Sequence, residues 1–200
     1  MSVHTTMPES PTSLRDGEPH LTSLNLPCIA EQYAELAKLA AQKEWSHIDY
    51  LATLLEGEAN LRHDRATQSR MRLARFPVIK PLEQFRWAWP TRMNRLQVQN
   101  HCRLAFLHDK ANLIFLGGVG LGKTHLATAL GYAACLQGYS GLFPSAIDVI
   151  NTLAAAKSTG RLKAALKKYT QPALLILDEL GYLPIDEGGA DLLFQVIALR

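Results

Sequence analysis

The residue types best suited to phosphate chemistry lie in one short segment, Gly117-Gly118-Val119-Gly120-Leu121-Gly122-Lys123-Thr124. Their spacing fits G-x-x-x-x-G-K-[ST], the pattern of a phosphate-binding P-loop or Walker A motif. Glycines let the backbone close around a phosphate and supply several N–H donors. The Lys123 amine can reach β- and γ-phosphates, and the Thr124 hydroxyl can ligate Mg²⁺. We therefore expect this loop to bind a phosphate-bearing ligand.

Two elements must position this loop, and the sequence predicts both. Residues 112–116 form a short apolar run with the length and flanks of a buried strand. After the loop, apolar residues recur at helical spacing, at positions 126, 127, 129, 130, 133 and 134. The positive end of that helix dipole would point at the bound anion. A dinucleotide fingerprint is excluded, because Lys123 replaces its third glycine.

An acidic pair follows a second apolar run, as expected of a Walker B motif. Residues 172–177 read Pro-Ala-Leu-Leu-Ile-Leu, which is typical of a buried parallel strand, and Asp178-Glu179 come directly after it. Parallel strands present ligands at their carboxyl ends, where the P-loop also lies. Asp178 would hold Mg²⁺ through its water shell, and Glu179 would polarise the attacking water. This combination predicts a site for ATP and Mg²⁺; a pair that only caps the next helix is the alternative.

The remaining elements complete an α/β pattern. Residues 140–143 are expected to form another strand, followed by a helix over residues 146–156 that Ser145 caps. Residues 186–200 predict a further helix. The predicted fold class is a P-loop NTPase with a parallel sheet flanked by helices, occupying residues 91–200.

The N-terminal part has a different character. Residues 1–23 are rich in Pro, Ser and Thr without apolar periodicity, which predicts a disordered tail. A helix over residues 24–43 and a second one, capped by Ser46 with Asp49 and continuing past Gly57 to residue 75, predict a small all-α domain. Prolines mark residues 76–90 as a linker. We expect the three aromatic residues of its segment 85–90 to pack on the core rather than stack on bases. Residues 91–107 predict another helix.

Composition places the chain in a reducing compartment. Hydrophobic residues make up 48% and charged residues 20% of the sequence, which is ordinary for a soluble globular protein. No apolar run could span a membrane, and the first 23 residues lack the apolar core of a secretory signal. The three cysteines are far apart and lack metal-ligand spacing. We expect a cytoplasmic protein.

Positive charge is concentrated in two segments. Residues 60–103 contain ten Lys and Arg against two acidic residues, and residues 157–168 contain five cations and no acid. Such segments suit contact with the phosphates of a nucleic acid, although solvated helix faces explain them equally well.

The motif surroundings resemble the IstB-like ATP-binding proteins. These are AAA+ helper ATPases of insertion-sequence transposition, related to DnaC-type helicase loaders. The similarity covers about residues 24–200 and rests on the P-loop followed by His125-Leu126-Ala127, on residues 177–184 (Leu-Asp-Glu-Leu-Gly-Tyr-Leu-Pro), and on residues 189–195 (Gly-Ala-Asp-Leu-Leu-Phe-Gln). The string from Asp178 to Pro184 is its most specific part.

The resemblance implies partners and roles. It implies ATP-dependent homo-oligomerisation on double-stranded DNA and recruitment of a transposase, with a replicative helicase as the alternative partner. The nucleotide site would comprise residues 117–125, His125 included; Lys123 and Glu179 would be catalytic, and Thr124 and Asp178 would hold the metal. A P-loop kinase that phosphorylates a small molecule is the alternative from a different class of function. Such a kinase would need an Arg-rich lid segment, and none follows the P-loop in this sequence.

The family's sensor strand and arginine finger would follow Arg200, so we expect an AAA+ core incomplete at its C-terminus. Nucleotide binding without turnover, as in an inactive remnant, therefore stays open beside ATP hydrolysis.

Overall fold

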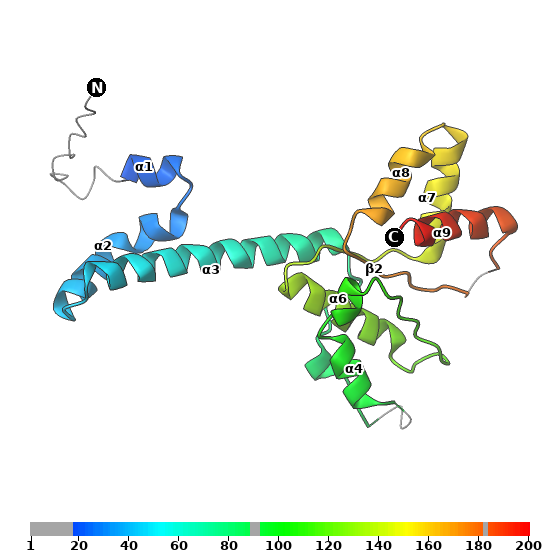
Figure 1. Cartoon of the computed structure of the whole chain (residues 1–200), viewed down its shortest axis with the longest axis horizontal. Coiled ribbons are helices and arrows are strands. Elements are labelled where there is room, and N and C mark those ends of the chain that lie inside the picture. The colour runs from blue at the N-terminus through cyan, green and yellow to red at the C-terminus, as the bar shows by residue number, and fades with distance from the viewer. Residues whose placement is uncertain (1–17, 89–92, 182–183) are drawn as a thin grey trace. The chain divides into compact units, whose positions relative to one another are not determined.

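A computed structural model of the chain describes residues 18–88, 93–181 and 184–200 (Figure 1). The chain divides into two compact units, Met1–Arg65 and Ala66–Arg200, and helix α3 (His47–Ala74) runs through the division. The division after residue 65 lies earlier in the sequence than the boundary at residue 75 that the prolines predict. The reason is that the end of α3 is hydrogen-bonded to other residues of the second unit. Arg70 Nε donates to the carbonyl of Cys135 at 3.0 Å, and the Phe143 amide donates to the carbonyl of Ala74 at 2.8 Å.

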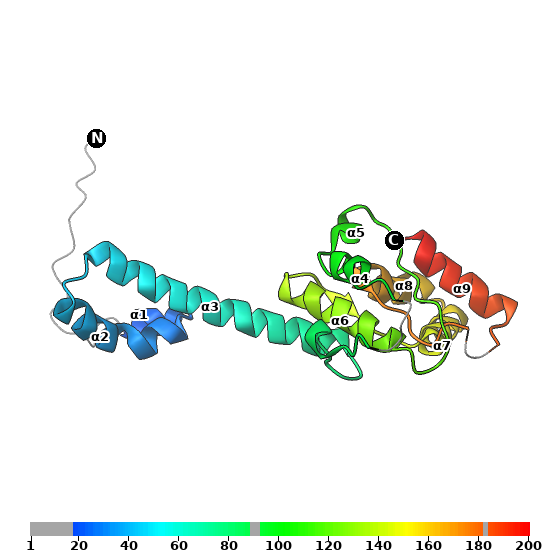
Figure 2. The same ribbon diagram turned by 90° about the horizontal axis from the view of Figure 1, so that it is seen from below.

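The first unit is helical, as the periodicity predicts. Helix α2 (Pro27–Gln42) lies beside the first half of α3 (Figure 2). The predicted cap is present: Ser46 Oγ accepts from the Asp49 amide at 3.1 Å and donates to its carboxylate at 2.7 Å. The buried carboxylate of Glu58, on α3, accepts from the amides of Cys28 and Ile29 at 2.9 and 3.3 Å. A side chain of α3 therefore satisfies backbone donors at the start of α2.

One expectation for this unit is wrong. Residues 18–23 form helix α1 (Glu18–Ser23) instead of belonging to a disordered tail. The side chain of Leu21 is partly buried, and its carbonyl accepts from the Leu26 amide at 3.0 Å, which closes the turn that leads into α2. The remainder of the predicted tail, residues 1–17, lies outside the described residues.

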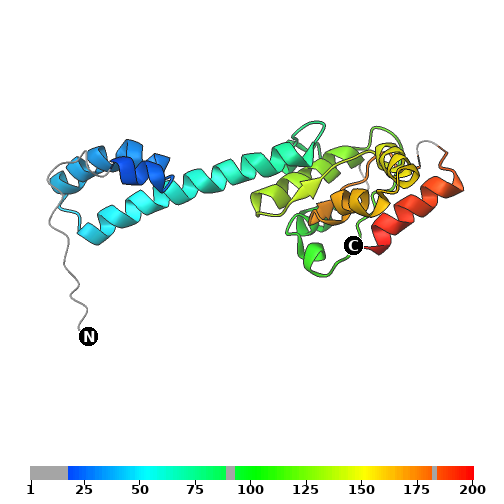
Figure 3. The same cartoon turned by 90° about the horizontal axis from the view of Figure 1, so that it is seen from above.

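The second unit contains a parallel sheet with helices on both faces, in agreement with the α/β prediction. Strand β1 (Gly141–Leu142) pairs with β2 (Leu174–Leu175) between the helices (Figure 3). A parallel bridge joins Ser145 to Asp178. Side chains of the second run alternate between the faces: Leu174 and Ile176 pack with α6 (Lys123–Leu136), whereas Leu175 and Leu177 pack with the opposite helices. Those helices are α7 (Ala146–Ser158), α8 (Leu162–Thr170) and α9 (Glu187–Ala198).

The strand predicted before the P-loop is not part of the sheet. Leu113 and Phe115 pack into the core while Ile114 and Leu116 are 77% and 89% exposed, so the alternation typical of a strand is present. However, no strand within the described residues pairs with residues 112–116. A β-ladder needs a hydrogen-bonded neighbour, and the two observed strands pair with each other.

The helix predicted over residues 91–107 is also divided. Helix α4 (Arg95–His101) begins at an Asn94 cap, and α5 (Ala105–His108) follows after Leu104. Leu104 is buried and takes a left-handed backbone with φ of 63°; it lies two residues beyond Cys102, the C-cap of α4, and is the N-cap of α5. A 3-10 turn, η2 (Leu82–Gln84), precedes them. Of the three aromatic residues in segment 85–90, Phe85 and Trp87 pack in the core as expected, and Trp89 lies outside the described residues.

Side-chain caps start helices α7 and α9. Ser145 Oγ accepts from the Asp148 amide at 3.1 Å, as predicted, and Asp186 Oδ1 accepts from the Gly189 amide at 2.7 Å. The Arg200 guanidinium donates to the carbonyl of Tyr169 in the last turn of α8 and to those of Pro172 and Ala173 after it, and its burial lowers its pKa. None of the helices in the described parts of the chain is long and apolar enough to cross a membrane.

Candidate nucleotide-binding site

The P-loop, residues 117–124, leads directly into the N-terminus of α6. Gly122 is the N-cap of this helix and has a left-handed backbone with φ of 83°, which favours glycine. Lys123 Nζ donates to the carbonyls of Gly117 and Gly118 at 2.9 and 2.8 Å, so the lysine reaches back across the loop. The positive end of the α6 dipole and this ammonium group therefore lie at the same loop, as an anion site requires.

The structure brings together the two predicted metal-binding side chains. Thr124 Oγ1 lies 3.3 and 3.2 Å from the carboxylate oxygens of Asp178, across 54 residues of sequence. The Asp178 backbone is fixed by the bridge to Ser145 and by the Ala146 amide, which donates to its carbonyl at 2.9 Å. Proteins commonly bind Mg²⁺ through one or two oxygen ligands together with the phosphates of the substrate. A hydroxyl and a carboxylate beside a phosphate-binding loop fit this pattern.

Glu179, the predicted general base, is exposed beside this pair. Its backbone is left-handed, with φ of 60°, which is a strained conformation for a residue with a Cβ. Within the described residues its carboxylate has no hydrogen-bond or ion-pair partner. Its position next to Asp178 comes from the chain alone.

His125 contacts protein groups on the side of the loop that faces residues 81–85. Its Nε2 lies 3.3 Å from the carbonyl oxygen of Pro81, and its ring meets Phe85 edge to face with centroids 5.1 Å apart. Because a carbonyl only accepts, Nε2 must carry the proton in this contact.

The apolar residues of the loop differ in exposure. Val119 is 85% exposed, and Gly120 has open space where a Cβ would lie. Leu121 folds back, with its Cδ1 3.1 Å from the Cβ position of Gly117. Because their side chains carry no polar group, these residues could contact a phosphate only through their backbone amides.

Sequence reasoning missed the contact of Phe85 with this site. The ring is buried, and it packs with Val98 and with Leu126 in the first turn of α6. The only local signal was the run of aromatic residues from Phe85 onward, which predicted core packing without indicating which element it would contact.

The thiols do not belong to the site. Cys28, Cys102 and Cys135 are free cysteines. Burial raises the pKa of both the Cys102 and Cys135 thiols; the nearby Glu83 raises that of Cys102 further, whereas Arg70 partly offsets the effect at Cys135. Among the residues that the structure describes, no group of three or more His, Cys, Asp or Glu side chains could hold a metal ion.

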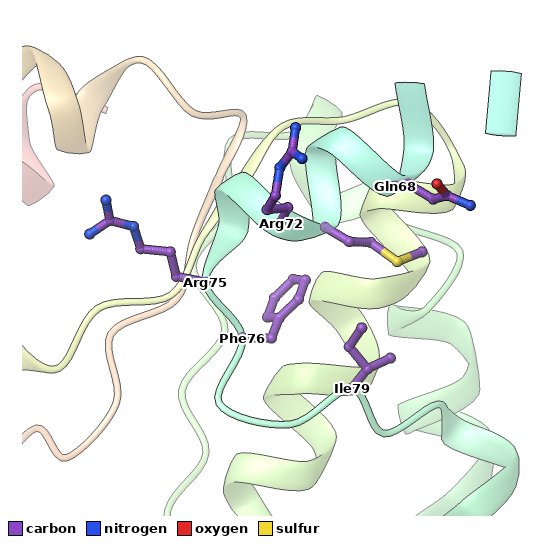
Figure 4. Close-up of a pocket in the computed structure, with 6 residues that line it drawn as sticks. Gln68, Arg72, Arg75, Phe76 and Ile79 are labelled. Carbon is purple, nitrogen blue, oxygen red and sulfur yellow. The ribbon is translucent and has the colours of Figure 1, made fainter. Parts of the chain in front are cut away.

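A hollow of about 360 Å³ lies elsewhere on the second unit, at the end of α3 (Figure 4). Met71, Phe76 and Ile79 give it an apolar lining, and Gln68, Arg72 and Arg75 complete it. The Arg75 guanidinium points away from Phe76 and Ile79 (Figure 4). None of these side chains belongs to the P-loop site.

Comparison with known proteins identifies the family. The family model of the IstB-like ATP-binding proteins matches residues 19–200. The chain belongs to this family. This IstB-like chain is 36% identical to an ATP-binding protein of insertion sequence IS5376 from Geobacillus stearothermophilus. The 177 aligned residues are 88% of the chain and 70% of that protein.

Two further relatives are similar to this IstB-like chain at the same level. The ATP-binding protein of insertion sequence IS21 from Pseudomonas aeruginosa is 38% identical over 180 residues, 90% of the chain and 68% of that protein. The ATP-binding protein of IS232 from Bacillus thuringiensis subsp. berliner is 35% identical over 181 residues, 90% and 72% respectively.

Proposed function

We propose that this chain is the Mg-ATP-binding part of an AAA+ helper protein that acts on double-stranded DNA in transposition and recruits or activates a transposase. The single observation that carries the nucleotide site is the contact of Thr124 with Asp178 at the start of α6. The relatives are ATP-binding proteins of insertion sequences, which favours a transposase over a replicative helicase as partner. The free thiols agree with a cytoplasmic setting.

Each residue has a separate role in this proposal. Backbone amides of the loop and the Lys123 ammonium group bind the β- and γ-phosphates, for which Lys123 must leave the carbonyls of Gly117 and Gly118. Thr124 and Asp178 hold Mg²⁺, which supplies charge neutralisation on the phosphates. Glu179 orients a water molecule and accepts its proton if ATP is hydrolysed.

Binding of ATP to the purified chain, measured by calorimetric titration with and without Mg²⁺, tests this site. We expect Lys123→Ala to raise the Kd by about 10- to 150-fold in either condition, because a charge-assisted contact to phosphate is worth roughly 1.5–3 kcal/mol. Asp178→Asn should raise the Kd only when Mg²⁺ is present, since its carboxylate acts through the metal.

Lys110→Ala and Asp109→Asn are matched controls, because both side chains are exposed and precede the loop segment. They should bind ATP as the unchanged chain does. An unchanged chain that fails to bind Mg-ATP, or an Asp178→Asn variant that keeps the full effect of Mg²⁺, would contradict the proposal.

A further inference from the structure

The phenyl ring of Phe85 lies against the turn that starts α6. Its Cε2 and Cζ atoms are 2.7 and 3.2 Å from the position that a Cβ would occupy on Gly122. Phe85 is only 6% exposed, so the ring has little room to move away. Gly122 is the residue whose left-handed backbone turns the P-loop into the helix. The ring and this glycine therefore determine each other's position.

A second contact fixes the same segment to the same turn of helix. The His125 ring bonds to the carbonyl of Pro81 and meets the Phe85 ring edge to face. Phe85 also meets Trp87 edge to face, with centroids 4.9 Å apart, and the Arg95 guanidinium lies 5.0 Å from the centre of the Trp87 ring. A row of packed rings thus connects the P-loop turn to the start of α4.

We propose that Phe85 is a positioning residue for the P-loop. The ring holds Gly122 in its left-handed conformation and thereby aims the loop amides and the first turn of α6 at the phosphates. This inference rests on the proposed nucleotide site and adds to it a residue that contacts no phosphate. A loop held in its binding conformation before the ligand arrives binds more tightly, because less ordering accompanies binding.

Phe85→Leu tests the proposal, with Phe76→Leu as a matched control. Phe76 also places its ring against a glycine of α6, namely Gly131, where an added Cβ would overlap the ring. Gly131 lies nine residues beyond Gly122, about 13.5 Å along the helix axis. Both variants remove a ring from the same helix, so both should lower the melting temperature. Only Phe85→Leu should raise the Kd for Mg-ATP, by about tenfold.

Gly122→Ala, alone and combined with Phe85→Leu, completes a double-mutant cycle. Because the added methyl group and the ring compete for one space, the effects on the Kd should be non-additive by at least about threefold. Equal Kd values for Phe85→Leu and Phe76→Leu, or additive effects in the cycle, would overturn the positioning role. An unchanged chain that does not bind Mg-ATP would instead overturn the nucleotide site itself.

Amide hydrogen exchange of the unchanged chain tests the same proposal without a variant. If the ring row couples the loop to the preceding segment, Mg-ATP should slow exchange at residues 122–126 and also at residues 82–87. Slower exchange confined to the loop and α6 would contradict the coupling, whether or not Phe85→Leu folds.

Discussion

Thr124 and Asp178 show how the fold brings together two side chains that are far apart in the sequence. A hydroxyl and a carboxylate are common on any surface, but here they meet at 3.2–3.3 Å at the start of a helix. The parallel bridge between Ser145 and Asp178 sets the height of the carboxylate along the sheet. The site therefore depends on strand register, since a shift by one residue would turn Asp178 to the opposite face.

Glu179 is the residue at which backbone strain and a proposed role coincide. We expect Glu179→Gly to raise the free energy of unfolding by about 0.5–1 kcal/mol, because glycine adopts a φ of 60° without the strain of a Cβ. Urea denaturation measures this change. Glu179→Gln keeps the Cβ and should leave stability unchanged.

The neighbouring Leu180→Gly is the matched control, since Leu180 is exposed and lacks a positive φ. That variant should lose stability through the added freedom of its unfolded chain. Should Glu179→Gly also lose stability, the left-handed backbone at residue 179 is not a strained one.

At the scale of elements, the first turn of α9 contains two adjacent glycines in different surroundings. A Cβ on Gly189 would lie 2.9 Å from Asp186 Oδ1 and 3.1 Å from Ile150 Cγ2, whereas Gly188 faces open space. We expect Gly188→Ala to stabilise the chain by about 0.5–1 kcal/mol through helix propensity.

Gly189→Ala should instead destabilise the chain by about 1–2 kcal/mol, because the methyl group displaces the capping carboxylate and crowds the core. Thermal unfolding of the two variants side by side measures the difference. Equal melting temperatures would show that α9 can shift away from α7 without cost.

Local pattern predicted the helices better than the strands. Caps and periodicity identified the starts of α3 and α7, because both signals lie within a few residues of the feature they indicate. The break between α4 and α5 contains Leu104, a buried residue with a left-handed backbone, and the apolar spacing of residues 91–107 does not indicate such a residue. Residues 112–116 have the alternation of a strand, but pairing depends on a neighbour that local sequence does not specify.

The sequence predicted those contacts of the site that join two recognisable motifs, but not the contacts made by packing. The meeting of Thr124 with Asp178 follows from two motifs and from the rule that parallel strands present ligands at one edge. The contacts of Phe85 with Gly122 and of His125 with Pro81 join segments about 40 residues apart through packing alone. Spacing within one segment could not indicate them.

At the scale of the molecule, some Lys and Arg side chains bond to other groups of the protein, whereas others are exposed to solvent and could contact a partner. Arg62 pairs with Glu58 at 3.4 Å, and Arg70 donates to the Cys135 carbonyl, so these two members of the basic segment 60–103 support the fold. The five cations of residues 157–168 are all exposed, and no acidic residue occurs between Asp148 and Asp178. The second segment is therefore the more uniform surface for a polyanion.

If this surface contacts DNA, Lys163→Ala with Lys167→Ala should weaken binding and its salt dependence. The two lysines are one turn apart on α8, so both can face one phosphate backbone. The slope of log K against log salt concentration should become shallower by about 1.8, the value for two lost phosphate contacts. Fluorescence anisotropy with a labelled duplex at several salt concentrations measures it.

Lys38→Ala with Lys43→Ala makes the same change of charge on exposed residues of the first unit and should leave the slope unchanged. Equal slopes for both double variants would assign the effect to net charge rather than to α8.

The contact between Thr124 and Asp178 has a consequence for folding. The Thr124 hydroxyl lies within hydrogen-bond distance of the Asp178 carboxylate in an exposed contact, and Asp178 is only partly buried, so the chain needs no cation at this carboxylate in order to fold. Chelation should therefore leave the folded chain intact, in contrast to small domains whose metal is part of their folding free energy. A divalent ion would then bind and dissociate together with the nucleotide, and the free energy of unfolding of the unliganded chain would not depend on the metal concentration.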